Sequence, residues 1–202
     1  REKIKKKNNL YKEKLDYFSV GSTKRKIVQI DYNNRFSRKI NVNGILGFES
    51  AKAEGTSFLT HERNIFSAVL SLNHQLTNRL SYAVQYRKEW QKEINSPFLY
   101  SIGIEQEVNE NYTLSFNTSK NFRTPTFNDL YWNPGGNPDL ELENSYQFEL
   151  GNAINFKNFN FQLNGFYIKS TNLIQWTPND FGFWSPQNIS DTKNVGLEFS
   201  SN

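Results

Sequence analysis

The sequence predicts an all-β protein whose long antiparallel strands follow one another along the chain. The 202 residues are only 36% hydrophobic and yet 15% aromatic, their mean hydropathy is −0.73, and apolar residues recur with a period of two. Disordered chains are poor in aromatic residues, and a membrane-spanning helix needs an apolar run of roughly 18 residues, which this sequence lacks. Strands with one apolar and one polar face explain all three observations.

Strands are expected wherever apolar and polar residues alternate. Two weaker strands are predicted near residues 10–20 and 24–32. Clearer alternation follows, in chain order, at residues 37–48, 66–72, 80–86, 98–104, 112–116, 146–150, 159–167 and 195–199. This gives about ten strands, most of them with ten residues or more.

The connections between these strands alternate between short and long. Short polar turns are expected at residues 33–35, 76–78, 109–111 and 157–158, and long loops at residues 49–61, 91–97, 120–144 and 177–191. Such a rhythm produces successive hairpins with every long loop at the same end. Soluble β-sandwiches have strands of about five or six residues, whereas long alternating strands with this asymmetry are typical of an up-and-down transmembrane β-barrel wall.

Aromatic residues cluster near the ends of the expected strands, as at Trp90, Tyr100, Trp132, Trp176 and Trp184. Tyr and Trp form girdles at membrane interfaces, because the ring lies at headgroup level with its polar group in water. The alternative is the aromatic-rich core of a soluble protein. Because many of these residues border loops, the pattern favours the girdle.

The composition excludes several kinds of chemistry. The chain has no cysteine, which rules out disulfide frameworks, cysteine-bound zinc and thiol nucleophiles. Neither of its two histidines, His61 and His74, has another histidine close to it in the sequence. No glycine-rich phosphate-binding loop occurs either. Glu105 and Glu107 share one strand face, which suits a charged lumen wall better than an acid–base pair. We therefore expect neither an enzyme nor a cofactor, and no resident metal.

The start of the chain is strongly basic, with five lysines and arginines at Arg1, Lys3, Lys5, Lys6 and Lys7. Such an arm can attract nucleic acid or anionic lipid, but a solvated chain end is the simpler interpretation, and we expect no nucleic-acid partner. No signal peptide is visible and the first residue is not Met. We therefore expect the chain to be part of a longer protein.

The loop at residues 120–144 breaks the alternation and contains the most specific motif. It reads Asn121-Phe122-Arg123-Thr124-Pro125-Thr126-Phe127-Asn128-Asp129-Leu130-Tyr131-Trp132, then Asn133-Pro134-Gly135-Gly136-Asn137-Pro138-Asp139-Leu140-Glu141-Leu142-Glu143. This resembles TonB-dependent outer-membrane receptors, in which Phe-Arg-(Ala/Thr)-Pro-Thr, a Leu-Tyr pair and Gly-Asn-Pro-(Asp/Asn)-Leu lead into a strand. The matching positions are Phe122, Arg123, Pro125, Leu130, Gly136, Asn137, Pro138 and Leu140. The resemblance is close over residues 116–199.

One position departs from the family pattern, since Glu141-Leu142-Glu143 stands where relatives usually have Lys-Pro-Glu. With Asp139, these residues form a run of alternating carboxylates. Such a run could bind Ca²⁺ through its oxygen atoms, or it could be a solvated edge facing the lumen. We favour the solvated edge.

The resemblance implies that residues 1–202 are part of the barrel domain of a receptor of about 22 strands with a plugged lumen. It also implies the outer membrane of a Gram-negative bacterium, with the lipid bilayer, TonB (through a plug domain not contained in this chain) and possibly a surface lipoprotein as partners. The loop sequence Tyr-Trp-x-Pro-Gly-Gly-Asn-Pro is most similar to cobalamin receptors of Bacteroidetes-type bacteria. Three alternatives stay open: a siderophore or haem receptor, an adhesin or protease barrel, and a soluble carbohydrate-binding β-sandwich.

Aromatic residues in the long loops are the expected contacts for a captured nutrient, since Tyr and Trp bury large areas at modest entropic cost. The candidates are Tyr131, Trp132, Asn133, Trp176, Phe183 and Trp184. The alternative role of each is a membrane-interface anchor. Arg123 is expected to brace the base of its loop.

Overall fold

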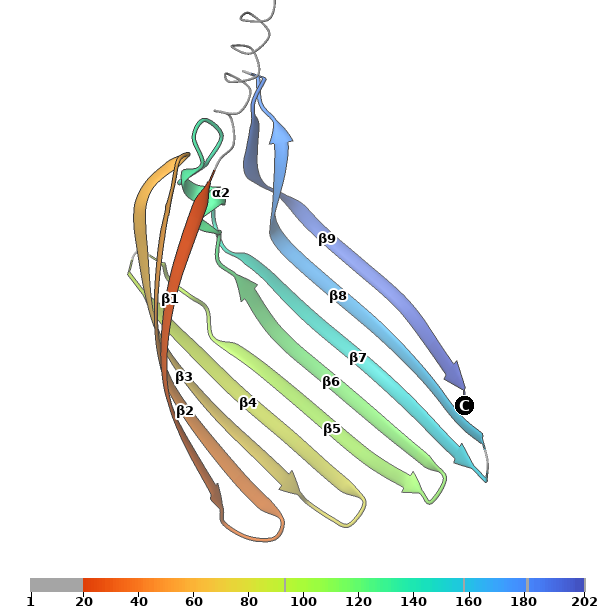
Figure 1. Cartoon of the computed structure of the whole chain (residues 1–202). Coiled ribbons are helices and arrows are strands. Elements are labelled where there is room, and N and C mark those ends of the chain that lie inside the picture. Colours follow the sequence, from red (N-terminus) through yellow and green to blue (C-terminus); the bar gives the residue numbers. More distant parts are fainter. Residues whose placement is uncertain (1–19, 93, 158, 181, 202) are drawn as a thin grey trace, which may run out of the picture.

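The computed structural model describes residues 20–92, 94–157, 159–180 and 182–201. They form one nine-stranded antiparallel sheet, in which every strand pairs with its neighbours in the sequence (Figure 1). This confirms the up-and-down prediction. Apart from Val20, the strand expected near residues 10–20 lies outside the described residues.

The strands are long, and within the described residues one short helix interrupts their succession. The elements are β1 (Gly21–Arg35), β2 (Ile40–Gly55), β3 (Phe58–Gln75), β4 (Leu80–Gln91), β5 (Leu99–Asn109), β6 (Tyr112–Arg123), α2 (Phe127–Tyr131), β7 (Glu143–Phe156), β8 (Phe159–Pro178) and β9 (Trp184–Ser201). No helix among the described residues is long and apolar enough to cross a bilayer.

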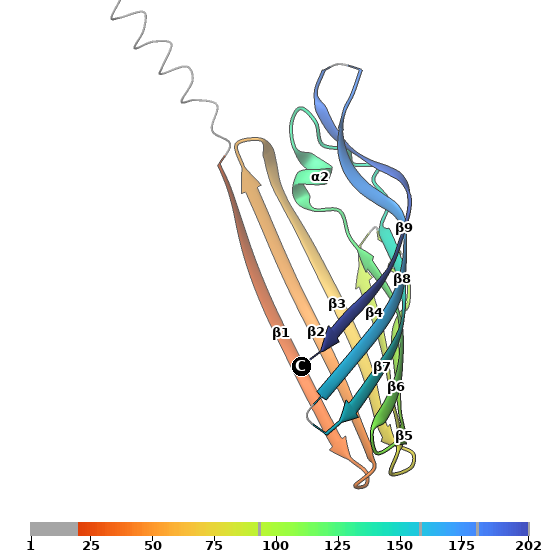
Figure 2. The ribbon, with the colours of Figure 1, turned by 90° about the vertical axis from the view of Figure 1, so that its right-hand side faces the viewer.

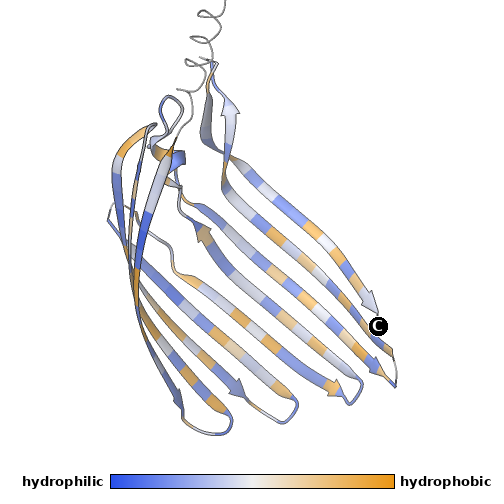
Figure 3. Ribbon diagram, viewed as in Figure 1, coloured by the Kyte–Doolittle hydropathy of each residue, from blue (hydrophilic) through white to orange (hydrophobic). Residues whose placement is uncertain are grey.

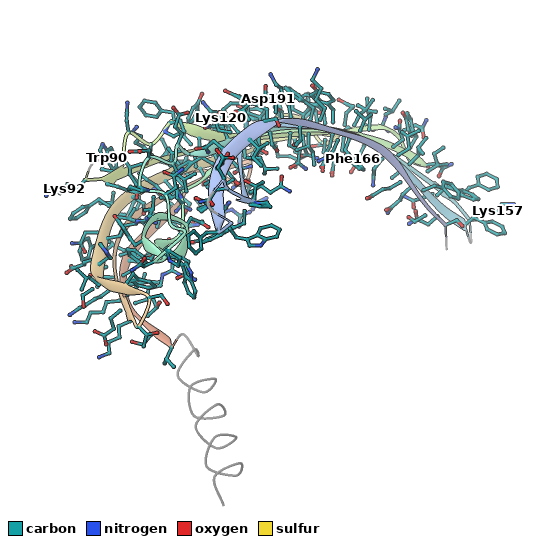
Figure 4. All side chains as sticks on the ribbon, turned by 90° about the horizontal axis from the view of Figure 1, so that it is seen from above. Trp90, Lys92, Lys120, Lys157, Phe166 and Asp191 are labelled. Carbon is teal, nitrogen blue, oxygen red and sulfur yellow. The ribbon has the colours of Figure 1, made fainter. Side chains whose placement is uncertain are left out.

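The sheet curves into an arc, which Figure 2 shows from the side and Figure 4 from above. Helix α2 lies on the concave side of the arc, where Phe166 also points, whereas Trp90 and Lys120 point to the convex side (Figure 4). A curved sheet of this kind is a wall section of a barrel, with the concave face toward the lumen.

The convex face is apolar across the whole sheet. Register places one row of cross-strand partners on it, which consists of Ile104, Phe116, Leu150, Gly165 and Leu197. Polar residues occupy the alternate positions, so that hydrophobic and hydrophilic residues alternate along each strand (Figure 3).

The wall has almost no apolar core of its own. Among the described residues, the buried hydrophobic side chains are Ala53 and Ile174, whereas Leu46 and Leu70, on strands paired at both edges, are 62% and 58% exposed. So large an exposed apolar surface requires a partner, and for a barrel wall that partner is lipid.

Apart from the tight β2–β3 turn at residues 56–57, the short turns gather at one end of the sheet, and the long loops lie at the other (Figure 1). Loops 92–98, 124–142 and 179–183 share one end, opposite the connection between Phe156 and Phe159. We call these the loop end and the turn end. The arrangement agrees with the hairpin rhythm expected from the sequence.

Several expected connections are wrong in extent. Residues 33–35, expected as a turn, are the end of β1, and the turn follows at residues 36–39; loop 120–144 shortens to residues 124–142. Residues 49–61 are mostly strand, because β2 continues to Gly55 and β3 begins at Phe58, and loop 177–191 shrinks to residues 179–183. Beyond the bilayer both faces of a strand meet water, so the apolar alternation stops although the backbone ladder continues.

Candidate functional site

The loop end carries a compact group of side chains that we call the loop cluster. It consists of residues 124–142 with α2, the hairpin tip at residues 55–61, and the upper part of the β8–β9 hairpin at residues 172–190. All six residues expected to contact a ligand lie within it.

Helix α2 begins with a reciprocal capping box. The backbone N–H of Asp129 donates to Thr126 Oγ1 at 3.1 Å, and the backbone N–H of Thr126 donates to Asp129 Oδ2 at 2.9 Å. Such a box satisfies two backbone donors that a helix start would otherwise leave unpaired. The carboxylate of Asp129 is thereby held at the base of the helix.

Asp129 also links the helix to the neighbouring strands. Its side chain is buried, its Oδ1 accepts a hydrogen bond from Trp176 Nε1 at 3.0 Å, and its Oδ2 lies 3.5 Å from an Arg123 guanidinium nitrogen. A buried carboxylate is stable only when it is paired and hydrogen-bonded. Asp129 therefore ties α2 to β6 and β8.

Arg123 and Glu143 close the base of the loop where β6 and β7 begin to separate. Two Arg123 nitrogens donate to the Glu143 carboxylate at 2.5 and 2.6 Å, a bidentate geometry that is strong and directional. The backbone N–H of Ile174 donates to the same carboxylate at 2.6 Å. The sequence interpretation of Arg123 as a brace is consistent with this geometry.

Both side chains lie outside the membrane-spanning part of the strands. Lys120 is the first charged residue on the convex face of β6 and marks the membrane boundary, and Arg123 and Glu143 lie beyond it, on the lumen face. Partial burial on its own raises the pKa of Glu143, but hydrogen bonds from Arg123 and the Ile174 N–H, together with the charge of Arg123, bring that pKa below its ordinary value. The hydrogen bond to Glu143 is the main reason that the pKa of Arg123 is raised. Both groups are charged at neutral pH.

The second half of the loop packs against the β8–β9 hairpin. A Cβ atom on Gly135 would collide with the backbone oxygen of Trp184, so only glycine fits there. Asn137 Nδ2 donates to the backbone oxygen of Pro186 at 3.1 Å. Asn188 binds Glu141 in both directions, accepting from its N–H at 2.8 Å and donating to its carbonyl at 3.2 Å. These contacts fix the loop against β9.

The first half of the loop packs against β3. The ring of Tyr131 stacks on His61, with centroids 3.5 Å apart and planes at 4°. Arg63 donates to the backbone oxygen of Pro125 at 2.9 Å and lies over the ring of Phe127 at 4.9 Å. A recess of about 510 Å³ opens beside these residues, lined by Arg63, Phe127 and Tyr131 and by Leu140 and Leu142.

The six expected contact residues differ in how available they are. Phe183 and Trp184 are 48% and 61% exposed at the tip of the β8–β9 hairpin, and Asn133 is exposed as well. Tyr131, Trp132 and Trp176 are half-buried. The hydrogen bond of Trp176 to Asp129 places this side chain inside the loop cluster rather than toward lipid.

The carboxylate run offers little to a cation. Glu143 is held by Arg123, and Glu141 accepts from Asn172 Nδ2 at 2.7 Å. Over the part of the chain that the structure describes, no group of three or more His, Cys, Asp or Glu residues is arranged to hold a metal ion.

The sequence interpretation passed over several members of the loop cluster. Asp129 had a readable signal, since Thr126 and Asp129 have the spacing of a capping box. His61, Arg63 and Asn188 had none, because their partners are distant in the sequence.

A curved antiparallel wall with an outward apolar band and a structured loop cluster at one end defines a transmembrane β-barrel of the outer-membrane class. The sequence model of the family described as "TonB dependent receptor-like, beta-barrel" matches residues 5–202, and the chain belongs to this family. Its members are transporters of the Gram-negative outer membrane rather than enzymes, so this wall lies in that membrane.

Two curated relatives are similar to parts of the chain. The vitamin B12 transporter BtuB of Photobacterium profundum is 24% identical over 157 residues, which are 76% of this chain and 26% of the relative. The vitamin B12 transporter BtuB of Vibrio vulnificus is 34% identical over 85 residues, which are 42% of this chain and 14% of the relative. The matched part of the chain thus spans about a quarter of the first relative.

Solved structures share the fold at low sequence identity. The siderophore receptor PirA of Pseudomonas aeruginosa superposes with a TM-score of 0.81 at 15% identity, covering 91% of this chain and 40% of that one. A ferric enterobactin receptor (PfeA) mutant of the same species, in complex with enterobactin, gives 0.75 at 15% identity, covering 91% and 34%. This structural likeness shows the barrel architecture alone and does not identify the nutrient that the receptor carries.

Proposed function

We propose that this wall belongs to a receptor that takes up cobalamin across the outer membrane. The observation that carries the proposal is that both curated relatives are vitamin B12 transporters. The Tyr131-Trp132 loop sequence resembles cobalamin receptors as well. The extracellular loops capture the ligand, and TonB drives its passage through the plug.

The loop cluster supports this role chemically. A cobalamin molecule has a broad, largely apolar corrin ring fringed by amide groups. Flat aromatic side chains suit the ring, whereas amide and backbone groups suit the fringe. Phe183 and Trp184 are exposed. Asn133 directly follows the half-buried pair Tyr131 and Trp132 in the sequence, and Tyr131 lines the recess. We assign first contact to Phe183 and Trp184.

Growth tests separate cobalamin from iron carriers. A strain that lacks the full-length gene is complemented with the wild type, with Phe183→Ala/Trp184→Ala, or with Phe36→Ala, a control for an exposed phenylalanine at the turn end. The deletion is expected to abolish growth on limiting cobalamin and to leave growth on limiting iron unchanged. The double variant is expected to lower cobalamin uptake about tenfold. Each lost aromatic contact contributes somewhat under 1 kcal/mol to binding, and two such losses correspond to about a tenfold weaker affinity.

The opposite result, a defect on limiting siderophore or haem iron with normal growth on limiting cobalamin, would assign the receptor to iron uptake. TonB coupling is tested on the same strains. A protonophore is expected to stop uptake while leaving binding of cobalamin at the cell surface intact. Uptake that persists without the proton gradient would contradict the coupling.

A further inference from the structure

The β8–β9 hairpin bends where it leaves the wall. Its register shifts between Ser170 and Leu173 and again between Leu173 and Ile174, so the ladder that aligns the lower strands is interrupted there. Seen from above, the chain turns near Asp191 from the arc toward its concave side, where α2 lies (Figure 4). Bulges bend a strand and re-aim the side chains beyond them. The direction of the upper hairpin, residues 172–190, is therefore set at this bend.

Asn172 lies within the bend and has an unusual backbone conformation. Its φ is 57°, in the left-handed region that residues other than glycine seldom adopt and in which Asn is enriched. Among the described residues, Lys157 at the turn end is the only other non-glycine residue with a positive φ. Such a conformation persists only where surrounding contacts enforce it. Neighbouring groups, rather than the strand itself, therefore hold the bend.

Two residues from different elements hold Asn172, namely Glu141 of loop 124–142 and Asn188 of β9. Asn172 Nδ2 donates to Glu141 Oε2 at 2.7 Å, and Asn188 Nδ2 donates to the backbone oxygen of Asn172 at 2.7 Å. Asn188 also forms two hydrogen bonds with the backbone of Glu141. We call Glu141, Asn172 and Asn188 the bend network. Each of its members contacts the other two.

Glu141 gives the bend network a charged acceptor. A hydrogen bond to a carboxylate is roughly twice as strong as one between neutral groups. Glu141 stands where the family pattern usually has Lys, and an ammonium group cannot accept the hydrogen bond that Asn172 donates. The contact between Glu141 and Asn172 is therefore a feature of this chain and not of the family motif.

The bend network lies between the wall and the exposed rings of Phe183 and Trp184. Above the bend, strand pairing continues from Ile174 and Asn188 up to Pro178 and Trp184. Four residue steps of strand correspond to roughly 13 Å. A small rotation at the bend therefore displaces both rings together.

We propose that the bend network positions Phe183 and Trp184 for ligand capture, by fixing the angle at which the upper hairpin leans over the concave side. Its three members are positioning residues that act on the ligand through the two rings. The inference rests on the proposed function, which assigns first contact to these rings. A hairpin already fixed in its bound position avoids the entropic cost of ordering it on binding. Loss of the network is expected to weaken binding by at most about tenfold, the effect of removing both rings.

Two measurements on the full-length receptor test the proposal. The first is the distance between spin labels attached at Lys52→Cys on β2 and Asp180→Cys near the hairpin tip, measured by pulsed electron paramagnetic resonance without ligand. The second is the equilibrium affinity for cobalamin. The test variants are Asn188→Ala and Asn172→Gly, which keeps the left-handed backbone at no steric cost and removes the amide. The control is Gln187→Ala, which removes an exposed amide that points to the opposite face of β9 from Asn188.

The wild type and the control are expected to give one narrow distance distribution. Both test variants are expected to give a broad one and to bind cobalamin about fivefold more weakly, within the limit that the two rings set. In a receptor that already carries Phe183→Ala/Trp184→Ala, Asn188→Ala is expected to lower the affinity no further, because effects that act through the same contact are not additive.

Glu141 supplies a rescue by the conservative variant. Glu141→Ala is expected to behave like the test variants. Glu141→Gln is expected to keep the narrow distribution and an affinity within about twofold of the wild type, since its amide oxygen still accepts from Asn172. Unfolding of the barrel in urea is expected to be the same for both variants, which separates positioning from loss of stability.

Three outcomes would overturn the proposal. Narrow distributions in every variant would show that other contacts fix the bend. A broad distribution with unchanged cobalamin affinity would show that capture does not depend on the angle of the hairpin. A full loss of affinity from Asn188→Ala in the receptor without the two rings would show that Asn188 acts by another route. A wild type that binds no cobalamin would instead contradict the proposed function, while the distances would still show whether the network fixes the hairpin.

Discussion

The barrel wall and the loop cluster hold their residues in place by opposite means. Wall side chains such as Leu70 stay largely exposed, and the strands are held by the backbone ladder and by lipid. In the loop cluster, carboxylates such as Asp129 and Glu143 bind ring nitrogens, guanidinium groups and backbone N–H groups. Damage to the wall is therefore expected to weaken the whole barrel, whereas damage to the loop cluster is expected to stay local.

The largest effect is expected from a charge on the lipid side of the wall. Leu163 lies on the convex face near the middle of the apolar stretch of β8 between Phe159 and Lys169, between its partners Asn152 and Phe199. Leu163→Arg is expected to lower the unfolding free energy of the intact receptor in lipid vesicles by about 2–4 kcal/mol, the cost of a cation at the bilayer midplane. Reversible unfolding in urea measures it.

Two controls from the same strand sharpen this prediction. Phe159→Arg, near the membrane boundary, is expected to cost about 0–1 kcal/mol, and Gln162→Arg on the lumen face also much less than Leu163→Arg. Comparable losses at Leu163 and Phe159 would contradict the transmembrane placement of β8, because a soluble core would not distinguish depth.

The next effect belongs to the loop cluster. Asp129→Ala removes the carboxylate that accepts the Thr126 N–H in the capping box, the acceptor of Trp176 Nε1 and a partner of Arg123. We expect a local loss of about 2 kcal/mol, seen as faster hydrogen exchange over residues 126–142. Unfolding of the barrel in urea should be unchanged. Asp139→Ala, which removes an exposed carboxylate of the same loop, should leave exchange unaltered.

Glycine-to-alanine substitutions, which add one methyl group, compare how tightly the loop cluster and the wall are packed. Gly135→Ala forces a Cβ onto the Trp184 backbone oxygen, whereas a Cβ at Gly44 of β2 meets nothing within 4 Å. The first change is expected to cost the loop cluster about 1–3 kcal/mol, and the second to be neutral or to stabilise β2 by up to about 1 kcal/mol. Limited proteolysis of the loop and urea unfolding measure the two, and equal sensitivity would erase the contrast.

The smallest effect is expected from pH. Because the pKa of Glu143 is below its ordinary value of 4.5, this carboxylate stabilises the loop cluster above that value, and the stabilisation is lost as pH falls further through the lowered pKa. The protection factor of the Ile174 amide, which compares its exchange rate with that of an unfolded chain at the same pH, should fall below about pH 4.5 in the wild type. Glu143→Gln should show the same protection factor on both sides of this pH, and a change in protection that survives this substitution would point to another group.

The sequence predicted the wall better than the loop cluster, for a physical reason. A transmembrane strand must alternate apolar and polar residues, so each of β2 to β9 can be recognised from its own local sequence. Outside the bilayer this requirement lapses, which is why Lys52 and Glu54 of β2 were expected to be part of a loop. Asp129 and Trp176, 47 residues apart, meet only after the strands have paired, and no local pattern encodes their contact.

The alternation along the strands also matters before the barrel exists. A protein bound for the outer membrane first crosses the inner membrane, where long apolar segments are retained as helices. In β8, Asn160, Gln162 and Asn164 separate Phe161, Leu163 and Gly165, so the unfolded segment is too polar to be retained. The same residues become a continuous lipid-facing surface once the strands pair. The period-two pattern thus lets the unfolded chain pass the inner membrane and still forms a continuous apolar surface once the strands pair in the outer membrane.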